Sequence, residues 1–311
     1  MKAKTLLFSA IGSLCVWLGG LLTSYGHGVP DIVWQTNAHH NVRSVAFSGD
    51  GRHLASGAED DTAIVWALSN RTAVVKVTTP AKVTSIDLSP TASFFVTGGD
   101  DGATRNWSAA TGMRNCGSRP NDNIVWSVDI SYQGSLLAVG KSNGRIDVAP
   151  TPCMPGGLSL SGHAGDILEV TFSRAGTQLA SASSGGSAVI WRVSDGSILH
   201  TLTGHSYFPP EEYEDETVIN PVYSVDFSPD DTLLATSGAD GTARLWQVAD
   251  GTEVRVLDGG GIIGRDLYGS AVRFSADGKT LFTVTTGAIK FWRVADGQLL
   301  ELSCNPTCSG W

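Results

Sequence analysis

Positively charged side chains are scarce in this chain of 311 residues. The 21 lysines and arginines are outnumbered by 30 aspartates and glutamates, which gives a formal net charge of −9 at pH 7. Proteins that hold a nucleic-acid backbone do so with clustered lysine and arginine, so we expect no nucleic-acid partner. Only 16% of the residues are charged, whereas 37 are glycine and 41% are hydrophobic. This composition excludes a disordered chain and fits a globular protein rich in strands and turns.

Motifs for catalysis and for metal binding are also missing. No nucleophile motif and no Ser-His-Asp arrangement stands out. The chain has only five cysteines, and Cys304 and Cys308 have no second pair at metal-ligand spacing. The adjacent His39 and His40 would point to opposite faces of a strand, which does not suit binding of one ion. We therefore expect no catalytic residue, no metal site and no cofactor, and a protein that is not an enzyme.

Long apolar runs are confined to the first 26 residues. Lys2 and Lys4 precede an apolar stretch, and the small residues Ser24 and Gly26 stand before a cleavage point ahead of His27. This order is typical of a secretory signal peptide over residues 1–26, and an uncleaved membrane anchor is the alternative. The interpretation places the protein in the periplasm or outside the cell, with membrane contact only through residues 1–26 if the signal is not cleaved.

Four cysteines follow this segment, and an oxidising compartment would permit disulfides among them. Their even number is consistent with two bridges, and three pairings are open. A bridge between the last two would close a small loop in the C-terminal tail, residues 304–311. The four are Cys116, Cys153, Cys304 and Cys308.

Five segments rich in small residues end in a tryptophan. One of them reads LLATSGADGTARLW, residues 233–246. The first two tryptophans are 41 residues apart, and the second and third are separated by 84, which is twice 42. A degenerate copy, LLAVGKSNGRIDVA, fills the long interval with Ala149 at the tryptophan position. The five tryptophans are Trp66, Trp107, Trp191, Trp246 and Trp292.

A second recurring segment precedes each copy, as in VYSVDFSPDD from residue 222. Its alternation and the turn residues after it predict three strands joined by tight turns, and most copies add a short fourth strand such as 252–259. The chain is therefore expected to be all-β, with six four-stranded units.

The repeat resembles that of the WD-repeat β-propeller family, in which repeats of about 40–45 residues begin with Gly-His and end with Trp-Asp. The resemblance covers residues 34–303 and implies a single β-propeller, most simply of six four-stranded blades, over residues 27–303. No copy keeps the aspartate after its tryptophan. There are seven candidates for the fourth strand, so either 31–39 or 297–303 is expected to complete the ring and the other to be surplus.

In that family a histidine, a serine or threonine, an aspartate and the tryptophan form a buried hydrogen-bonded tetrad. The first repeat is expected to keep three members, Ser56, Asp60 and Trp66. Only the fifth repeat is expected to have all four, as His205, Thr236, Asp240 and Trp246.

The clearest departure from the period is a 55-residue interval between Trp191 and Trp246, with the excess in the acidic and aromatic segment 206–221. The resemblance places this loop on the face where WD-repeat proteins commonly bind partners, and aromatic residues amid charge make good binding anchors. We therefore expect an exported, non-catalytic scaffold for a protein partner of unknown identity. The expected contact residues are Tyr207, Phe208, Tyr213, Arg43, Trp126, Tyr223 and Tyr268.

The alternative is a propeller that binds a small molecule, a sugar or a cation in its central channel, possibly with hydrolytic activity. The first strand of several repeats carries an acid that would face the channel. These candidate acids are Asp87, Asp129, Glu169 and Asp226.

Overall fold

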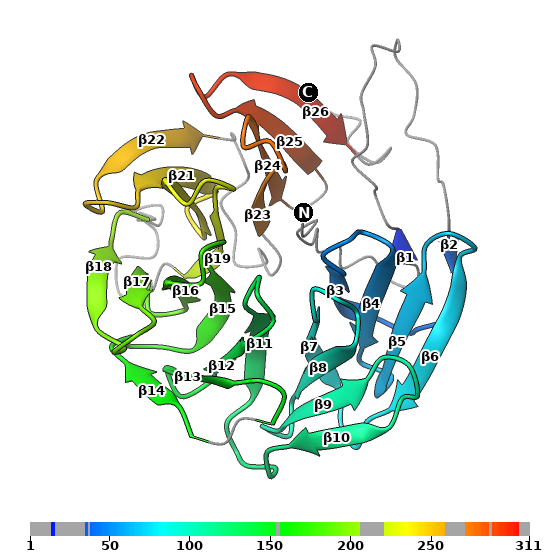
Figure 1. Cartoon of the computed structure of the whole chain (residues 1–311). Helices are drawn as coiled ribbons and strands as arrows, with labels where there is room; N and C mark the ends of the chain where they lie inside the picture. The colour runs from blue at the N-terminus through cyan, green and yellow to red at the C-terminus, as the bar shows by residue number, and fades with distance from the viewer. Residues whose placement is uncertain are drawn as a thin grey trace, which may run out of the picture.

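Six sheets of four antiparallel strands are arranged in a ring, as Figure 1 shows for the computed structural model of the chain. The structure describes residues 14–15, 35–36, 38–153, 156–205, 221–258, 271–285 and 288–304. The prediction of an all-β propeller with six four-stranded blades is confirmed. Within these ranges no helix has the length and apolar character needed to cross a membrane.

Each blade consists of four strands that are consecutive in the chain. The first strand lies nearest the centre of the ring and the fourth lies at its rim. The first two blades are β3 Val42–Phe47, β4 His53–Ala58, β5 Thr62–Ala67, β6 Thr72–Thr78, and β7 Val83–Leu88, β8 Phe94–Gly99, β9 Thr104–Ser108, β10 Arg114–Gly117. The next two are β11 Val125–Ile130, β12 Leu136–Lys141, β13 Arg145–Pro150, β14 Leu158–Ser161, and β15 Ile167–Phe172, β16 Gln178–Ser183, β17 Ala188–Arg192, β18 Ile198–Leu202. The last two are β19 Val222–Phe227, β20 Leu233–Gly238, β21 Thr242–Gln247, β22 Glu253–Asp258, and β23 Ala271–Phe274, β24 Thr280–Thr285, β25 Ala288–Arg293, β26 Leu299–Cys304.

The C-terminal strand completes the sixth blade, because β26 pairs with β25. Among the described residues of the other candidate, 31–39, the one strand is β2 (Gln35–Thr36), which pairs with β1 (Leu14–Cys15) in a separate two-stranded sheet. The sequence left two candidates for the fourth strand of the sixth blade, and the C-terminal segment supplies it. Strand β1 comes from the segment expected to be a signal peptide.

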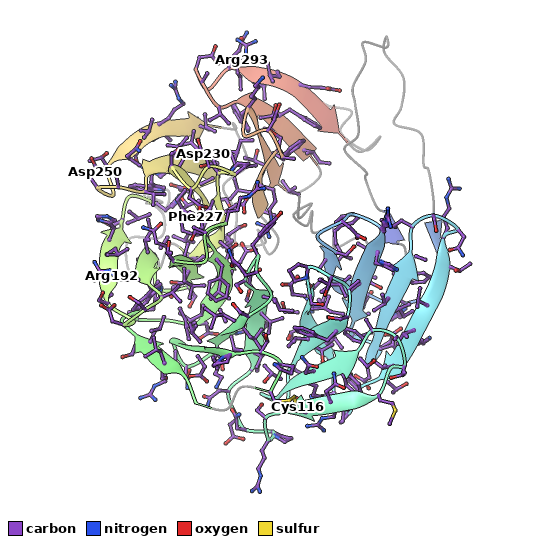
Figure 2. All side chains as sticks on the ribbon, viewed as in Figure 1. Cys116, Arg192, Phe227, Asp230, Asp250 and Arg293 are labelled. Atoms are coloured by element: carbon purple, nitrogen blue, oxygen red, sulfur yellow. A yellow bond between two sulfur atoms is a disulfide. The ribbon has the colours of Figure 1, made fainter. Side chains whose placement is uncertain are left out.

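The core consists of apolar layers between neighbouring blades. Five clusters of buried side chains each join two consecutive blades, from the first and second to the fifth and sixth. Phe227 of β19, labelled in Figure 2, is fully buried in the layer between the fourth and fifth blades. A further cluster around Trp66 contains residues of the first blade alone. By contrast, Arg192, Asp250 and Arg293 lie on the outer rim (Figure 2).

Small residues before each tryptophan allow neighbouring blades to approach closely, as expected from the sequence. A Cβ atom at Gly57 would overlap the side chain of Val83, the first residue of the next inner strand. Gly98 has the same relation to Val125 in the following blade. These glycines are therefore required by packing and not by chain flexibility.

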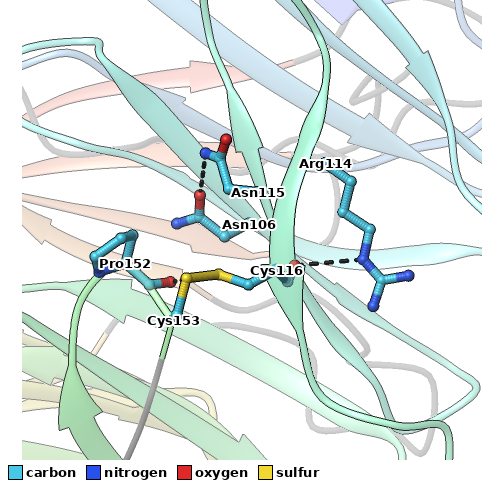
Figure 3. The surroundings of a disulfide bond; sticks show 6 residues. All are labelled: Asn106, Arg114, Asn115, Cys116, Pro152 and Cys153. Atoms are coloured by element: carbon cyan, nitrogen blue, oxygen red, sulfur yellow. Dashed lines mark hydrogen bonds between the residues drawn. A yellow bond between two sulfur atoms is a disulfide. The ribbon is translucent and has the colours of Figure 1, made fainter.

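A disulfide joins the second blade to the third. Cys116 of β10 is bonded to Cys153 in the turn after β13, with 5.5 Å between the Cα atoms (Figure 3). Beside it, the amide of Asn115 donates a hydrogen bond of 2.7 Å to Asn106 Oδ1. The bridge thus ties the rim of the second blade to the third blade, in which Ala149 replaces the tryptophan. The remaining cysteine pair, Cys304 and Cys308, includes a residue outside the described ranges.

Candidate protein-interaction face

The inner strand of each of the first five blades has a β-bulge at its second residue. The register shifts there relative to the next strand, so the second residue is left without a partner in the ladder. Its side chain is the most exposed, or among the most exposed, of its strand, whereas most of the later residues are buried. The five bulged residues are Arg43, Thr84, Trp126, Leu168 and Tyr223.

The bulges lie beside the turn that follows the second strand of the same blade. In the first blade, the backbone N–H of Glu59 in that turn donates to the carbonyl of Asn41, just before the inner strand. The same bond occurs in the next four blades, for example from Ser184 to Asp166. We call the five bulged residues and these adjoining turns the bulge face.

Three of the expected contact residues therefore share one structural position. Arg43 is more than half exposed and forms an ion pair with Glu59. The hydrogen bond from Asn41, followed by the hydrogen bond and charge of Arg43, holds the pKa of Glu59 below its usual value. Trp126 and Tyr223 occupy the matching bulges of the third and fifth blades.

The remaining expected contact residues, Tyr207, Phe208, Tyr213 and Tyr268, lie outside the described residues. Sequence reasoning missed Thr84 and Leu168, although both stand second in the recurring inner-strand segment and an alignment on that segment would have found them.

The tetrad of the fifth blade is hydrogen-bonded throughout. The indole N–H of Trp246 donates to Thr236 Oγ1 at 2.9 Å, and His205 Nε2 lies 2.7 Å from the same oxygen. His205 Nδ1 is 2.9 Å from Asp240 Oδ1. Burial opposes ionisation of Asp240, but the hydrogen bond and charge of His205, with the bonds from Thr242, lower the pKa of Asp240 to about 2.

The expectation that only the fifth blade has a complete tetrad is wrong. In the first blade His39 Nε2 lies 2.7 Å from Ser56 Oγ, and its Nδ1 lies 3.4 Å from Asp60 Oδ1. The indole N–H of Trp66 donates to Ser56 Oγ at 2.8 Å. His39 thus completes the set from a position without the preceding glycine of the family pattern, which is why the sequence did not reveal it.

Acidification is expected to destabilise the fold through His163 of the fourth blade. Its Nε2 lies 2.6 Å from Ser181 Oγ, and burial lowers its pKa from 6.5 to about 4. Between these two pH values the unfolded chain binds a proton that the folded chain does not, so stability falls as the pH is lowered through this window. The loss by pH 4 should approach about 3 kcal/mol.

Urea unfolding at pH 7, 6, 5 and 4.5 would measure this loss. The variant His163→Gln should show a smaller fall across the window, because it removes the titrating group. Parallel curves for the two proteins would contradict the assignment.

The channel acids hold neighbouring blades together. The carboxylate of Asp87 accepts the backbone N–H of Ile130 at 2.7 Å, and Asp129 accepts that of Phe172 at 2.7 Å. Asp226 accepts the N–H of Phe274 at 2.8 Å. Serines two residues earlier in the inner strands do the same, as when Val128 N–H donates to Ser85 Oγ at 3.1 Å. We call these side-chain-to-backbone bonds between blades rungs.

Glu169 forms a rung and an ion pair. Its Oε2 accepts the N–H of Val225 at 2.9 Å, and its carboxylate pairs with the guanidinium of Arg273, two blades away in the chain order. Burial opposes the charge of Arg273, but the carboxylates of Glu169, Asp226 and Asp129 raise its pKa. The four acids proposed for channel chemistry thus have structural partners. Within the described ranges no three His, Cys, Asp or Glu side chains are placed to hold a metal ion.

The repeat is recognised by a family model. The model described as "WD domain, G-beta repeat" matches residues 23–67, 73–108, 157–192 and 215–247, which contain the first three strands of the first, second, fourth and fifth blades. The third and sixth blades lack both the histidine and the aspartate of the tetrad. Together, the six-bladed fold and these matches show a β-propeller in which four of the blades carry recognisable WD repeats.

Curated relatives share these repeats over part of their length. The chain is 32% identical to eukaryotic translation initiation factor 3 subunit I of Aspergillus terreus over 172 residues, 50% of the chain and 46% of the relative. It is 32% identical to the protein of that name from Candida albicans over 127 residues, 41% of the chain and 31% of the relative. It is 25% identical to the periodic tryptophan protein 2 homolog of Dictyostelium discoideum over 252 residues, 79% of the chain and 26% of the relative. The chain thus spans less than half the length of these relatives.

These relatives contradict the expectation of an exported protein. Translation initiation takes place inside the cell, so relatives that are subunits of an initiation factor point there, and the prediction of a periplasmic or extracellular scaffold is wrong. The apolar N-terminal run alone carried that prediction, and two of its residues form strand β1. By contrast, the prediction that the chain is not an enzyme is confirmed, because WD-repeat proteins are generally scaffolds and the related initiation-factor subunits are non-catalytic.

Proposed function

We propose that the chain is a non-catalytic scaffold that binds a protein partner through the bulge face. The observation that carries the proposal is the repeated bulge, which takes the second residue of the inner strand out of the ladder register at the same position in each of the first five blades. Bulges of this kind re-aim side chains at functional sites. Repeat architectures also present broad, rigid surfaces that suit protein partners.

The relatives support a partner within a multisubunit assembly, since several are by name subunits of translation initiation factor 3. On sequence grounds, Tyr207, Phe208, Tyr213 and Tyr268 remain part of the proposed contact surface. The net charge of −9 favours a partner with a basic contact surface.

Quantitative affinity capture from the native host tests the proposal. The double variant Arg43→Ala with Trp126→Ala removes a cation and an aromatic side chain from the bulge face. Truncation of a tryptophan hot spot costs about 2 kcal/mol or more, so partner recovery should fall about 30-fold.

The matched control is Arg192→Ala with Ile198→Ala, which removes an ion-paired arginine and an exposed apolar side chain from the rim of the fourth blade. It should recover the same partners as the unmodified chain. Equal recovery by both double variants, with unchanged thermal midpoints, would refute the bulge face as the contact surface.

A further inference from the structure

Trp126 differs from the other tryptophans of the described residues. Its side chain is 37% exposed, whereas Trp66, Trp107, Trp191, Trp246 and Trp292 are buried. It occupies the bulge of β11, and its indole N–H reaches Asp166 of the fourth blade, so the partly exposed ring lies beside the seam between the third and fourth blades. An exposed tryptophan is a large apolar surface that costs little entropy to hold in place.

Asp166 fixes the edge of this indole. It stands just before β15 in the fourth blade, and its Oδ2 accepts the indole N–H of Trp126 at 3.0 Å. In the described part of the chain, no donor is bonded to its other carboxylate oxygen, Oδ1. Lys141, which lies opposite Val125 in the ladder, is already paired with Asp147. The charge of Asp166 is therefore available beside an aromatic face.

A flat aromatic face beside a carboxylate suits the guanidinium group of arginine. The planar cation can stack on the indole while its edge donates hydrogen bonds to the carboxylate, a geometry that the ammonium of lysine cannot reproduce. The chain uses half of this arrangement at the other end of the same two inner strands, where Arg174 Cζ lies 5.0 Å from the centroid of the Tyr132 ring. There the cation is the chain's own, whereas no cation of the described residues stacks on Trp126.

We propose that Trp126 and Asp166 form a recognition site for an arginine side chain of the protein partner. The inference rests on the proposed function and adds to it the chemistry of one contact. The partner's guanidinium stacks on the indole of Trp126 and pairs with Oδ1 of Asp166, across the seam between two blades. The negative charge of the chain favours such a basic segment.

The experiment titrates the full chain, labelled with nitrogen-15 at tryptophan, with three peptides. These are acetyl-Gly-Arg-Gly-amide, its lysine counterpart and its citrulline counterpart, which keeps the shape of arginine without the charge. The indole N–H resonance of Trp126, assigned from Trp126→Phe, should shift with the arginine peptide and saturate. The citrulline peptide should bind at least on the order of fivefold more weakly than the arginine peptide, and the lysine peptide should have an intermediate affinity.

Asp166→Asn tests the carboxylate, because the amide oxygen still accepts the indole N–H while the charge is removed. It should weaken binding of the arginine peptide on the order of fivefold or more. The control Asp195→Asn removes an exposed acid from the rim and should bind like the unmodified chain.

Equal binding of the arginine and citrulline peptides by the unmodified chain would overturn the proposal without any variant. So would a shift confined to other tryptophans, or full binding by Asp166→Asn. None of these outcomes touches the capture experiment, so failure of the arginine site is distinguishable from failure of the proposed scaffold function.

Discussion

Replacing Arg273 with leucine is expected to lower the free energy of unfolding by about 3 kcal/mol. The guanidinium and the carboxylate of Glu169 are both largely buried, with side-chain exposures of 13% and 18%. Arg273 also donates to Ser224 Oγ at 2.9 Å, so its loss removes one donor from each of two side chains of other blades. Removing one member of a buried ion pair leaves the other charge uncompensated, which costs more than the pair itself contributes.

Urea unfolding of the single variant and of the double variant Glu169→Gln with Arg273→Met measures this effect. The glutamine oxygen can still accept the N–H of Val225, and no unpaired charge remains, so the double variant should recover most of the lost stability. A cost below about 1 kcal/mol for Arg273→Leu would show that Glu169 is well solvated in the channel and that the ion pair is not structural.

Replacing Trp246 with alanine is expected to cost about 3–5 kcal/mol, because it opens a cavity between the fourth and fifth blades. The indole is only 4% exposed and packs with buried residues of both blades. Its N–H also donates a hydrogen bond to Thr236 Oγ1, the central oxygen of the tetrad. Thermal and urea unfolding would both show the loss.

Trp126→Ala is the matched control, since it removes the same side chain from the exposed bulge. It should change stability by less than about 1 kcal/mol. Similar costs at both positions would contradict the distinction between buried and exposed tryptophans. Trp246→Phe, which keeps an aromatic ring but not the N–H, should lie between the two variants.

The blade architecture could be predicted from the sequence because the blades repeat the same pattern of residues. Small residues, a turn and an indole recur at a period set by four strands, and Ala149 could be placed by that period even though its tryptophan is missing. A repeat of this kind can be found in the sequence alone. The strand that completes the sixth blade could not be predicted, because two segments fitted the same pattern and only the pairing of β25 with β26 decides between them.

The contacts between blades could not be predicted in the same way. Asp87 and Asp129 looked like channel acids, since alternation along a strand does not reveal that their carboxylates reach the backbone of the next blade. The pairing of Cys116 with Cys153 depends on how two rims approach, which spacing does not encode. His39 completes a tetrad across 17 residues from Ser56, without the glycine that marks such a histidine elsewhere in the family pattern.

The rungs between blades have a direction. Each joins an acceptor side chain of one blade to a backbone N–H of the next, and the sixth blade, with Ala271 and Arg273 at the two acceptor positions, has no acceptor to offer. Backbone N–H groups are supplied by every residue type except proline, so a rung demands nothing of the sequence that receives it. A blade copied by gene duplication would carry its own acceptors and find donors already present in its new neighbour. As far as these bonds are concerned, a blade can therefore be added to such a ring without matched substitutions in the blades on either side.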